Sequence, residues 1–253
     1  MFAEERRKNI IYLLEKEKRV SVNELSGEFD VSRATIRRDL SELESDGFLR
    51  RTHGGAILRS SSKLELTFKE KEDKFFSEKK AIGKKAAELI KDGDSIFLDA
   101  GTTTRHIIDN LKGKKKLTIV THALHIINKI NEIKLDCELV VIGGNFKWST
   151  EAMVGPIAED ILKKLRIDKS FIGTNGFKLD SFATTPELGE AKIKEIALEI
   201  SSENFLLFDR SKWKQVYFYK FADFNLINYI ITDQIEEKRE AALNERGIEV
   251  IIA

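Results

Sequence analysis

Residues 31–47, V-S-R-A-T-I-R-R-D-L-S-E-L-E-S-D-G, decide how the first part of the chain folds. Ile36, Leu40 and Leu43 recur at i, i+4 and i+7, which predicts an amphipathic helix with one apolar stripe. Ser32 stands where the N-cap of that helix is expected. Arginines and small hydroxyl residues lie largely off the stripe. They suit either the major groove of DNA or the ordinary solvent contacts of a surface helix.

Two further helices are predicted before this stretch. The first covers residues 4–16 and places apolar side chains on one face. The second is short and ends near residue 28, and Ser21 and Glu24 at its start have the spacing of a capping box. A helix, a short helix, a turn and a longer helix form the order of a helix-turn-helix unit, whose last helix contacts DNA bases.

A basic hairpin is predicted to follow. Gly47 is expected to end the DNA-reading helix. Residues 48–58, F-L-R-R-T-H-G-G-A-I-L, have two apolar ends around a basic, glycine-containing middle, which predicts a β-hairpin wing. Arg50 and Arg51 would reach phosphates or the minor groove, so residues 1–58 are predicted to be a winged helix-turn-helix domain. The candidate DNA-contacting residues are Ser32, Arg33, Thr35, Arg37, Arg38, Arg50, Arg51, His53 and Gly54.

Composition favours a globular protein of the cytoplasm. Of the 253 residues, 34% are charged and 42% are hydrophobic, which argues against a disordered or membrane-bound chain. We expect neither a membrane span nor a signal peptide, because the apolar runs are short and the start of the chain is charged. The single cysteine, Cys137, excludes an internal disulfide and suits a reducing compartment. A net charge of +1 means that any DNA contact depends on local patterning.

The rest of the chain is predicted to be a linker followed by an α/β domain. Residues 59–76 are polar and are expected to become helical near their end, whereas residues 77–253 alternate apolar strands with helical patterns. This alternation predicts a mostly parallel sheet covered on both faces. The predicted strands are residues 95–99, 117–121, 139–143, 170–173, 205–209, 226–232 and 249–252. The predicted helices are residues 81–91, 105–111, 124–133, 156–165, 187–201 and 235–245.

Glycines and polar residues follow five of these strands, in residues 99–104, 121–122, 143–147, 173–176 and 209–212. Ligands of open α/β sheets bind beyond the carboxyl ends of the strands, so these segments are expected to line one pocket. The run G-T-T-T, residues 101–104, would bind a phosphate or carboxylate through hydroxyls and free N–H groups at a helix start. A threonine that only caps the next helix gives the same pattern.

A helix start is also predicted at T-T-P-E, residues 184–187, with hydroxyl caps and a proline at the first helical position. Glu190 and Lys194 follow within that helix. They are either an i,i+4 surface pair or a carboxylate aimed at sugar hydroxyls with an ammonium aimed at phosphate. Trp148 and Trp213 are expected in the core.

Known catalytic and cofactor patterns do not occur in the sequence. There is no Walker loop and no G-x-G-x-x-G motif, so nucleoside triphosphate and dinucleotide binding are not supported. His106, His122 and His125 have no carboxylate or cysteine at metal-ligand spacing, and no G-x-S-x-G elbow is present. We therefore expect no catalytic residue, no metal and no cofactor.

The chain as a whole resembles the DeoR family of bacterial sugar-metabolism regulators. The first matching run is R-A-T-I-R-R-D-L-S-E-L-E-S-D-G-F-L-R-R-T-H-G-G-A, residues 33–56. The second is I-G-K-K-A-A-E-L-I-K-D-G-D-S-I-F-L-D-A-G-T-T-T, residues 82–104. Three short runs follow in the family's order, G-G at 143–144, T-T-P at 184–186 and D-R-S-K at 209–212. The first run is highly specific, and the short ones are informative only in that order.

The resemblance implies a winged-helix repressor joined to a sensor domain shaped like ribose-5-phosphate isomerase, with a phosphorylated sugar as inducer. By position in the family, residues 101–104 would hold the phosphate, and the sugar would be surrounded by Asp99, Thr121, Lys147, Glu190, Lys194 and Lys212. The candidate effector-binding residues are Asp99, Gly101, Thr102, Thr103, Thr104, Thr121, His122, Gly143, Gly144, Lys147, Gly176, Glu190, Lys194, Asp209 and Lys212.

Three positions depart from the family pattern. The family usually has Asn in place of His122, often has Arg in place of Glu195, and commonly has Arg in place of Lys147. Lysine cannot offer the two-pronged grip of arginine on a phosphate. We expect these differences to change which ligand is chosen within the same ligand class.

The main hypothesis is a sequence-specific regulator, a repressor, that binds a double-stranded DNA operator as a homodimer or homotetramer and responds to a sugar phosphate. The alternative is an isomerase-like enzyme that acts on sugar phosphates and carries a DNA-binding appendage. The isomerases that the sensor resembles carry a D-G-A-D-E motif and a lysine–glycine motif. Neither occurs in this sequence, where the equivalent strand end reads D-K-S-F-I-G, residues 168–173.

Overall fold

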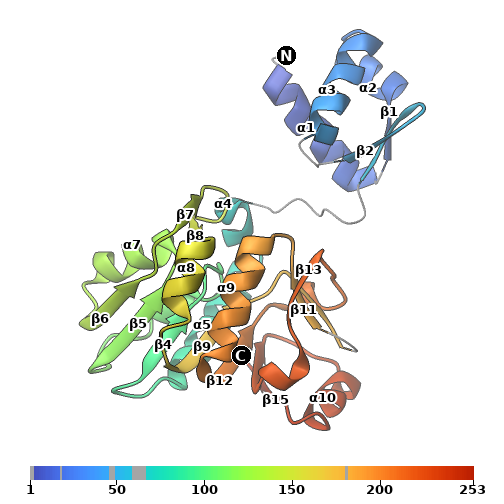
Figure 1. The fold of residues 1–253 in the computed structure, drawn as a ribbon. Helices are drawn as coiled ribbons and strands as arrows, with labels where there is room; N and C mark the ends of the chain where they lie inside the picture. Colours follow the sequence, from blue (N-terminus) through green and yellow to red (C-terminus); the bar gives the residue numbers. More distant parts are fainter. Residues whose placement is uncertain (1–2, 18, 46–48, 59–66, 180–181) are drawn as a thin grey trace. The chain divides into compact units, whose positions relative to one another are not determined.

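The computed structural model describes residues 3–17, 19–45, 49–58, 67–179 and 182–253. The chain divides into two compact units, residues 1–65 and residues 66–253 (Figure 1). The first unit is a helix-turn-helix fold with a hairpin, and the second is an α/β fold around a parallel sheet, so the predicted fold class is confirmed. No helix in these ranges is both long enough and apolar enough to cross a bilayer.

The first unit has three helices and a small antiparallel sheet. The helices are α1 (Ala3–Glu17), α2 (Val22–Glu28) and α3 (Arg33–Ser45). The strands β1 (Arg19–Ser21), β2 (Leu49–Thr52) and β3 (Gly55–Leu58) pair in the order β1-β3-β2. The predicted wing is the β2–β3 hairpin, and β1 is a third strand that the sequence did not predict. Gly47, expected to end α3, lies outside the described residues.

Local hydrogen bonds explain where two of these helices begin. Ser21 Oγ accepts from the Glu24 amide at 3.1 Å, and Glu24 Oε2 accepts from the Ser21 amide at 3.1 Å, so the predicted capping box is present. Ser32 Oγ accepts from the Thr35 amide at 3.1 Å, as expected of the N-cap of α3. The apolar stripe of α3 is buried against α1 and α2, which turns its basic side outward.

The second unit is built on a seven-stranded parallel sheet in the order β15-β14-β12-β9-β4-β5-β6. Its strands are β4 (Ser95–Leu98), β5 (Leu117–Thr121), β6 (Cys137–Val141), β9 (Ile167–Gly173), β12 (Ser201–Leu207), β14 (Tyr229–Thr232) and β15 (Glu249–Ile252). Each overlaps a predicted strand. The order places the ends of β12, β9 and β4 next to one another near the middle of the sheet.

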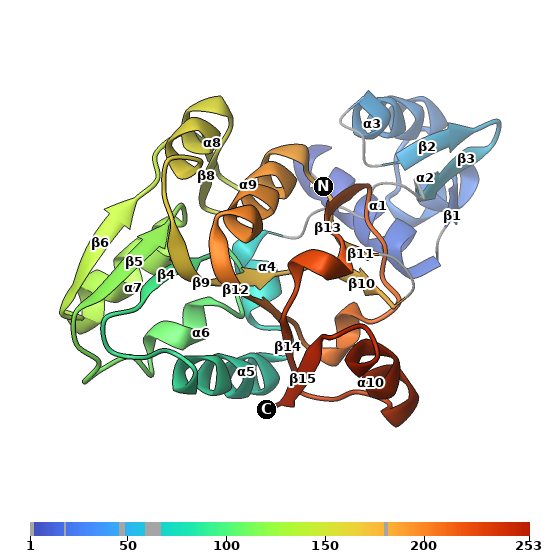
Figure 2. The same ribbon diagram turned by 60° about the horizontal axis from the view of Figure 1, so that its bottom comes forward.

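Helices cover both faces of this sheet (Figure 2). α8 (Pro156–Leu162) and α9 (Leu188–Glu199) pack on one apolar core, while α5 (Phe76–Glu88) and α7 (Leu124–Ile133) pack on the other. Later in the chain come α6 (Arg105–Ile108), α10 (Glu237–Asn244) and the 3-10 turns η1 (Arg210–Lys212) and η2 (Phe224–Leu226). Burial on both faces explains the nearly continuous apolar strands.

Two small antiparallel sheets were not predicted. β7 (Asn145–Lys147) pairs with β8 (Ala152–Val154), and β11 (Phe182–Thr185) lies between β10 (Gly176–Lys178) and β13 (Tyr219–Ala222). β11 contains the two threonines that were predicted to cap α9, and that prediction is wrong. Glu187 caps α9 instead, because its side chain accepts from the Glu190 amide at 3.0 Å. Trp148, expected in the core, is 86% exposed next to β7.

A short helix opens the second unit. α4 (Phe68–Glu72) occupies the part of the linker that was predicted to become helical, and Thr67 and Glu70 form a capping box at its start. α5 begins at Phe76, five residues earlier than predicted. Phe75 lies between the two helices in the left-handed conformation, at φ 54° and ψ 39°, so α4 and α5 are not continuous.

Candidate functional site

A cavity lies at the carboxyl ends of β4, β9 and β12. Residues 100–103 follow β4, residues 173–175 close and follow β9, and Phe208 and Lys212 follow β12; all of them line the cavity. These strands are neighbours in the sheet, so their following loops meet at one edge. The predicted candidates that line this cavity are Gly101, Thr102, Thr103, Glu190, Lys194 and Lys212.

The loop after β4 presents two hydroxyl groups to the cavity. Thr102 and Thr103 line it, whereas Thr104 is fully buried and donates its hydroxyl to the Asp99 and Gly101 carbonyls at 2.6 and 2.7 Å. Thr104 therefore shapes the loop rather than facing the cavity. The following helix, α6, is a single turn instead of the seven residues predicted, so its dipole adds little to anion binding. The groups that this part of the cavity offers to an anion are therefore the hydroxyls and the nearby cations.

Asp99 is buried beneath the cavity and holds other groups in place. Its Oδ2 accepts from Gly173 N at 3.0 Å and from Lys194 Nζ, and its Oδ1 lies 3.4 Å from His122 Nε2. Burial raises the pKa of Asp99, but Lys194 and His122 outweigh burial and hold it well below its ordinary value. Asp99 and His122 were predicted to surround the ligand, but they do not line the cavity.

Glu190 and Lys194 do not form the i,i+4 surface pair. Both are buried and both line the cavity. Lys194 pairs with Asp99, and Glu190 Oε1 lies 3.4 Å from Lys147 Nζ on β7. Burial raises the pKa of Glu190, but the positive charges of Lys147 and Lys194 outweigh burial and hold the pKa below its ordinary value. This carboxylate is therefore charged at neutral pH. Lys147 therefore acts on the cavity through Glu190.

Four further lysines line the cavity besides Lys194, which pairs with Asp99. They are Lys71, Lys74, Lys79 and Lys212. Burial lowers the pKa of Lys79 to about 8, and the charge of Lys212 lowers it further while Asp209 raises it. Burial also lowers the pKa of Lys212, again against Asp209. Ammonium groups that gather in one cavity repel one another, and their charges suit a strongly charged anion.

The remaining predicted candidates lie outside the cavity lining. Thr121 is buried and donates to the Leu98 carbonyl at 2.8 Å, which joins β5 to β4. Asp209 is buried, and one of its carboxylate oxygens accepts from Ser211 N at 3.0 Å. Gly176 allows close packing, because a side chain there would place Cβ 2.3 Å from the Gln215 carbonyl. Gly143 and Gly144 follow β6, where the cavity does not extend.

One wall of the cavity was not predicted from the sequence. Phe68 and Lys71 come from α4, Lys74 from the turn after it and Lys79 from α5, and Thr150 comes from the turn between β7 and β8. The segment carrying the first three was interpreted as linker, in which lysines are ordinarily solvated. The available signal was the repeated lysine in K-E-K-E-D-K, residues 69–74, next to an α/β domain.

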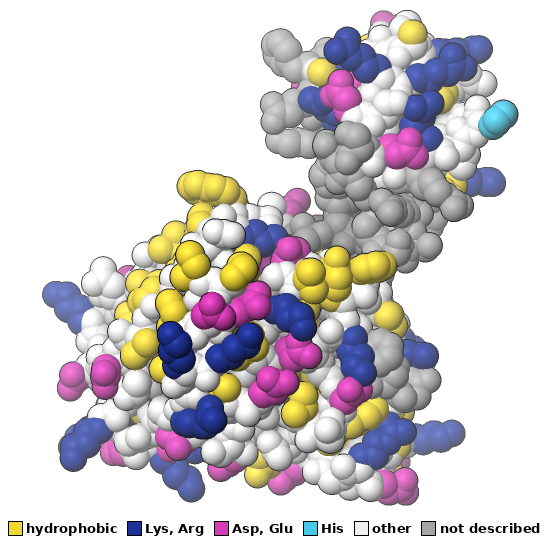
Figure 3. Space-filling model, viewed as in Figure 1, with side chains coloured by type: hydrophobic (Ala, Val, Ile, Leu, Met, Phe, Trp, Pro, Cys, Tyr) yellow, Lys and Arg dark blue, Asp and Glu magenta, His cyan; other side chains and the backbone are white. Residues whose placement is uncertain are grey.

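The first unit presents a separate, basic surface on α3. Arg33, Arg37 and Arg38 are exposed, and Ser32 and Thr35 lie at the start of the helix. The Arg38 side chain is 83% exposed with one contact to Glu42 at 3.4 Å. Figure 3 shows Lys and Arg side chains spread over the visible face of this unit. Exposed arginines on the last helix of a helix-turn-helix fold suit base and phosphate contacts.

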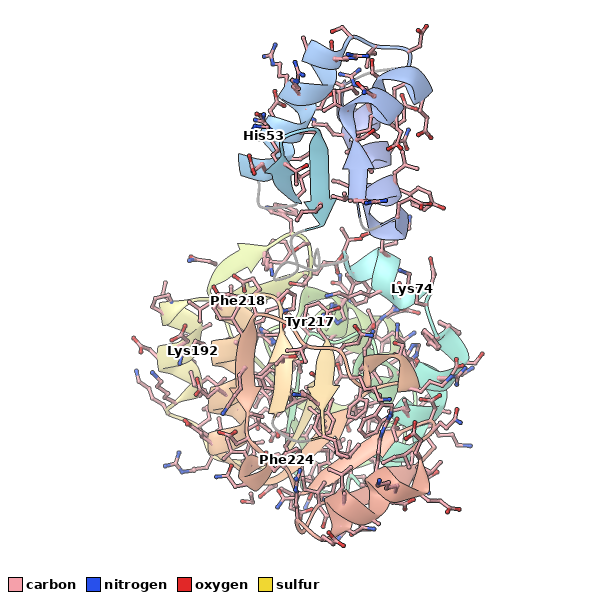
Figure 4. The ribbon with its side chains drawn as sticks, turned by 90° about the vertical axis from the view of Figure 1, so that its right-hand side faces the viewer. His53, Lys74, Lys192, Tyr217, Phe218 and Phe224 are labelled. Atoms are coloured by element: carbon pink, nitrogen blue, oxygen red, sulfur yellow. The ribbon has the colours of Figure 1, made fainter. Side chains whose placement is uncertain are left out.

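The hairpin next to α3 carries the other predicted contacts. His53 and Gly54 form its exposed turn, and Figure 4 shows His53 at that end. Arg51 is exposed, and it is tied to α3 because its amide donates to Glu44 Oε1 at 2.7 Å and its guanidinium donates to Ser41 Oγ. The side chain of Arg50 lies outside the described residues.

A buried ion pair fixes α3 against α1. Arg6 Nε donates to Asp39 Oδ2 at 2.6 Å and Arg6 Nη2 donates to Asp39 Oδ1 at 3.2 Å, in a two-pronged pair that is almost fully buried. Asp39 comes directly after Arg38 in the sequence. The pair therefore sets how the arginines of α3 are presented, and the sequence analysis did not foresee it.

Family models match both units. A model of the DeoR-like helix-turn-helix domain matches residues 6–62, and a model of the DeoR C terminal sensor domain matches residues 74–234. The chain belongs to the DeoR family. The resemblance found in the sequence motifs is therefore confirmed. The chain is a DNA-binding transcriptional regulator with a sensor domain. The residues that line its cavity lie in the range that the sensor model matches, except Phe68 and Lys71, which precede that range.

Relatives in this family cover nearly the whole chain. The HTH-type transcriptional regulator FruR of Bacillus subtilis is 39% identical over 93% of both chains. The lactose phosphotransferase system repressor of Staphylococcus epidermidis is 38% identical over 96% of both chains. Among solved structures, ribose 5-phosphate isomerase from Plasmodium falciparum aligns with 53% of this chain and 52% of its own at 17% identity and a TM-score of 0.39.

Proposed function

We propose that this DeoR-family regulator binds a phosphorylated sugar in the cavity and that the bound sugar lowers its affinity for operator DNA. The observation that carries the proposal is that five lysines line the same cavity as the hydroxyls of Thr102 and Thr103. Ammonium and hydroxyl groups are suited to a phosphate dianion. Glu190 and Asn175 on the same cavity are polar partners for sugar hydroxyls.

The lowered pKa values of Asp99 and Glu190 favour a sensor over an isomerase. A general base for proton abstraction works best with a pKa near the working pH. Asp99 and Glu190 are both held below their ordinary pKa values by lysines, so both are weak bases. Relatives of the family carry the names of regulators. We expect no turnover when the protein is incubated with ribose 5-phosphate, and measurable isomerisation would contradict this part of the proposal.

Ligand binding to the full-length protein is tested by thermal unfolding. Ribose 5-phosphate, glucose 6-phosphate and fructose 6-phosphate are compared with the same sugars without phosphate. A ligand present at 100 times its Kd stabilises the folded state by about 2.7 kcal/mol, so a binding sugar phosphate raises the Tm. Lys212→Gln and the pair Thr102→Ala and Thr103→Ala are expected to reduce the rise.

Lys192→Gln is the matched control for the loss of a lysine. Lys192 lies on the exposed side of α9, where it pairs with Glu195 at 2.7 Å (Figure 4). This variant is expected to respond to the ligand as the wild type does. If no sugar phosphate raises the Tm, or if the cavity variants respond as strongly as the wild type, the assigned cavity is wrong.

DNA binding is tested in a separate experiment, with DNA from upstream of the protein's own gene. Changing Arg37 and Arg38 together to Ala is expected to lower affinity at least about tenfold, because phosphate and base contacts are lost. The pair Lys163→Ala and Lys164→Ala removes the same charge from the exposed end of α8 and is expected to leave binding unchanged. Full DNA binding by the arginine variant would show that α3 does not contact the operator.

A further inference from the structure

One wall of the cavity is formed by the segment that follows the linker. Lys71 and Lys74 belong to residues 67–74, here named the α4 segment, and both line the cavity together with Lys212. We propose that Lys71 and Lys74 bind the anionic group of the effector directly, and that the α4 segment thereby passes the state of the cavity to the linker. This inference rests on the proposed function and names the element that couples ligand binding in the cavity to DNA binding.

The position of the α4 segment in the chain makes it suitable for coupling. Residues 59–66 precede it directly, and they join it to the DNA-binding unit. A change in how the segment is held therefore acts on the linker through the peptide chain itself. Figure 4 shows Lys74 at the surface of the second unit, next to α4. The coupling needs no contact between the two units.

The start of the α4 segment is attached to the turn between β7 and β8. The amide of Phe68 donates to the Ser149 carbonyl at 2.7 Å, directly before the cavity-lining residue Thr150. The Phe68 ring is buried and packs on His125, with 4.1 Å between the ring centroids. Phe68 itself lines the cavity. A ligand that orders this wall therefore also orders the first turn of α4.

The end of α4 is attached to two other walls of the cavity. Glu72 pairs with Arg105, which follows the loop of Thr102 and Thr103. Lys79 Nζ, itself at the cavity, donates to the Lys71 carbonyl. A helix as short as α4 is not stable by itself and depends on such attachments. Its order is thus tied to the cavity at both ends.

Charge explains why a ligand would change the order of this segment. Lys71 and Lys74 line the same cavity as Lys212, and like charges repel. The same charges contribute, after burial, to the lowered pKa of Lys212. A bound phosphate turns this repulsion into shared attraction. The ligand therefore has a different affinity for the docked and undocked segment, which is what a shift in population requires.

The test uses full-length protein and inorganic phosphate as the probe. Hydrogen exchange of the amides in residues 68–72 is measured with and without saturating phosphate, and the Kd for phosphate is measured by calorimetry. In the wild type, phosphate is expected to slow this exchange about tenfold, which corresponds to about 1.4 kcal/mol. Lys74→Gln and Lys71→Gln are each expected to raise the Kd about tenfold and, at the same phosphate concentration, to reduce the slowing of exchange from about tenfold to about twofold.

Lys69→Gln is the matched control within α4, because Lys69 is exposed and does not line the cavity. It is expected to match the wild type. If phosphate binds the wild type and Lys212→Gln weakens it, but Lys71→Gln and Lys74→Gln bind normally or exchange in residues 68–72 does not change, the role of the α4 segment is overturned and the proposed function stands. If phosphate does not bind the wild type, both fail.

Discussion

Lys79 is a buried lysine whose charge depends on its surroundings. Its pKa is lowered to about 8, chiefly by burial, with Asp209 opposing and Lys212 adding to the shift. Glu72 raises this pKa and Lys71 lowers it, both by smaller amounts. In the free protein, Lys79 therefore loses its proton above about pH 8. Phosphate at the cavity favours the charged form and raises the pKa again.

Effector affinity should consequently fall at high pH. Above pH 8, binding must be accompanied by uptake of a proton at Lys79, which costs up to about tenfold in affinity per pH unit until the pKa of the bound state is reached. Below about pH 6, the phosphate loses its second negative charge, so binding also weakens as the pH falls. Calorimetry of a stabilising sugar phosphate at pH 7.5 and 9.5 measures the effect.

Lys79→Met is the control for that measurement. Methionine keeps an unbranched side chain of similar length but has no charge. This variant is expected to bind more weakly at pH 7.5 and to lose less affinity between pH 7.5 and 9.5 than the wild type. An unchanged pH dependence would assign the titration to another group at the cavity.

At the residue scale, motif reasoning located the loop but not the partners of its charged groups. Thr102 and Thr103 line the cavity, as their place after a strand indicated. Asp99 and Lys194 are 95 positions apart, and their pairing depends on how α9 returns across the sheet. Nothing in the local sequence states this, so Glu190 was the more obvious partner for Lys194. Contacts between distant parts of the chain therefore determine that Lys194 pairs with Asp99.

Among the elements, α3 depends on one buried ion pair for its placement. Replacing one partner of a buried pair leaves the other charge without compensation, which costs about 3–5 kcal/mol. Asp39→Ala would remove both hydrogen bonds that Asp39 accepts from the buried Arg6 guanidinium at the interface of α1 and α3. We expect the first unit of this variant to unfold at a lower urea concentration, as measured by hydrogen exchange in α1 and α3.

Glu42→Ala is the comparison on the same helix. Glu42 contacts Arg7 and Arg38, but its side chain is 40% exposed. Exposed pairs contribute about 0–1 kcal/mol, so this variant is expected to keep nearly the stability of the wild type. Equal stability of the Asp39 and Glu42 variants would show that the buried pair does not hold α3.

The sequence predicted long, apolar elements better than short ones. The strands of the parallel sheet were recognisable because both of their faces are buried. β7, β8 and β10 have three residues each, and three residues are too few to show a periodic pattern. The start of α5 was predicted too late, because residues 76–80 are mostly polar and show no apolar pattern. Lys79 among them is nevertheless buried.

The whole molecule is proposed to act as a homo-oligomer, because one recognition helix reads only a short site. Ile157 and Ile161, one turn apart on α8, are 63% and 39% exposed. Leu188 at the start of α9 is also exposed, and Figure 3 shows hydrophobic side chains on this face of the second unit. Adjacent exposed apolar side chains are typical of protein contact surfaces.

Changing Ile157 and Ile161 together to Glu is therefore expected to lower the molar mass measured by light scattering. The same variant should lose affinity for paired half-sites in the upstream DNA while it keeps its far-UV spectrum. Lys164→Glu changes the charge next to α8 and serves as the control. An oligomer that persists in the double variant would place the contact elsewhere.

The order of domains was the most predictable property of the molecule. The motifs for a DNA-binding unit and an α/β unit stand in separate parts of the sequence, and the two family models match separate ranges. The linker between them was the least predictable part. Its polar composition is typical of a solvated connection, yet Lys71 and Lys74 in its second half line a cavity. Composition does not indicate which side chains a fold will place together.

The left-handed conformation of Phe75 gives residues 68–88 two geometric alternatives. A residue other than glycine costs about 1–2 kcal/mol in this conformation, so the present arrangement needs compensation from its surroundings. If Phe75 adopted helical angles, α4 and α5 would merge into one rod about 30 Å long. The α4 segment, which carries Lys71 and Lys74, would then leave its present place at the cavity, and the connection to the DNA-binding unit would start from a different point. A bound anion would oppose that extension.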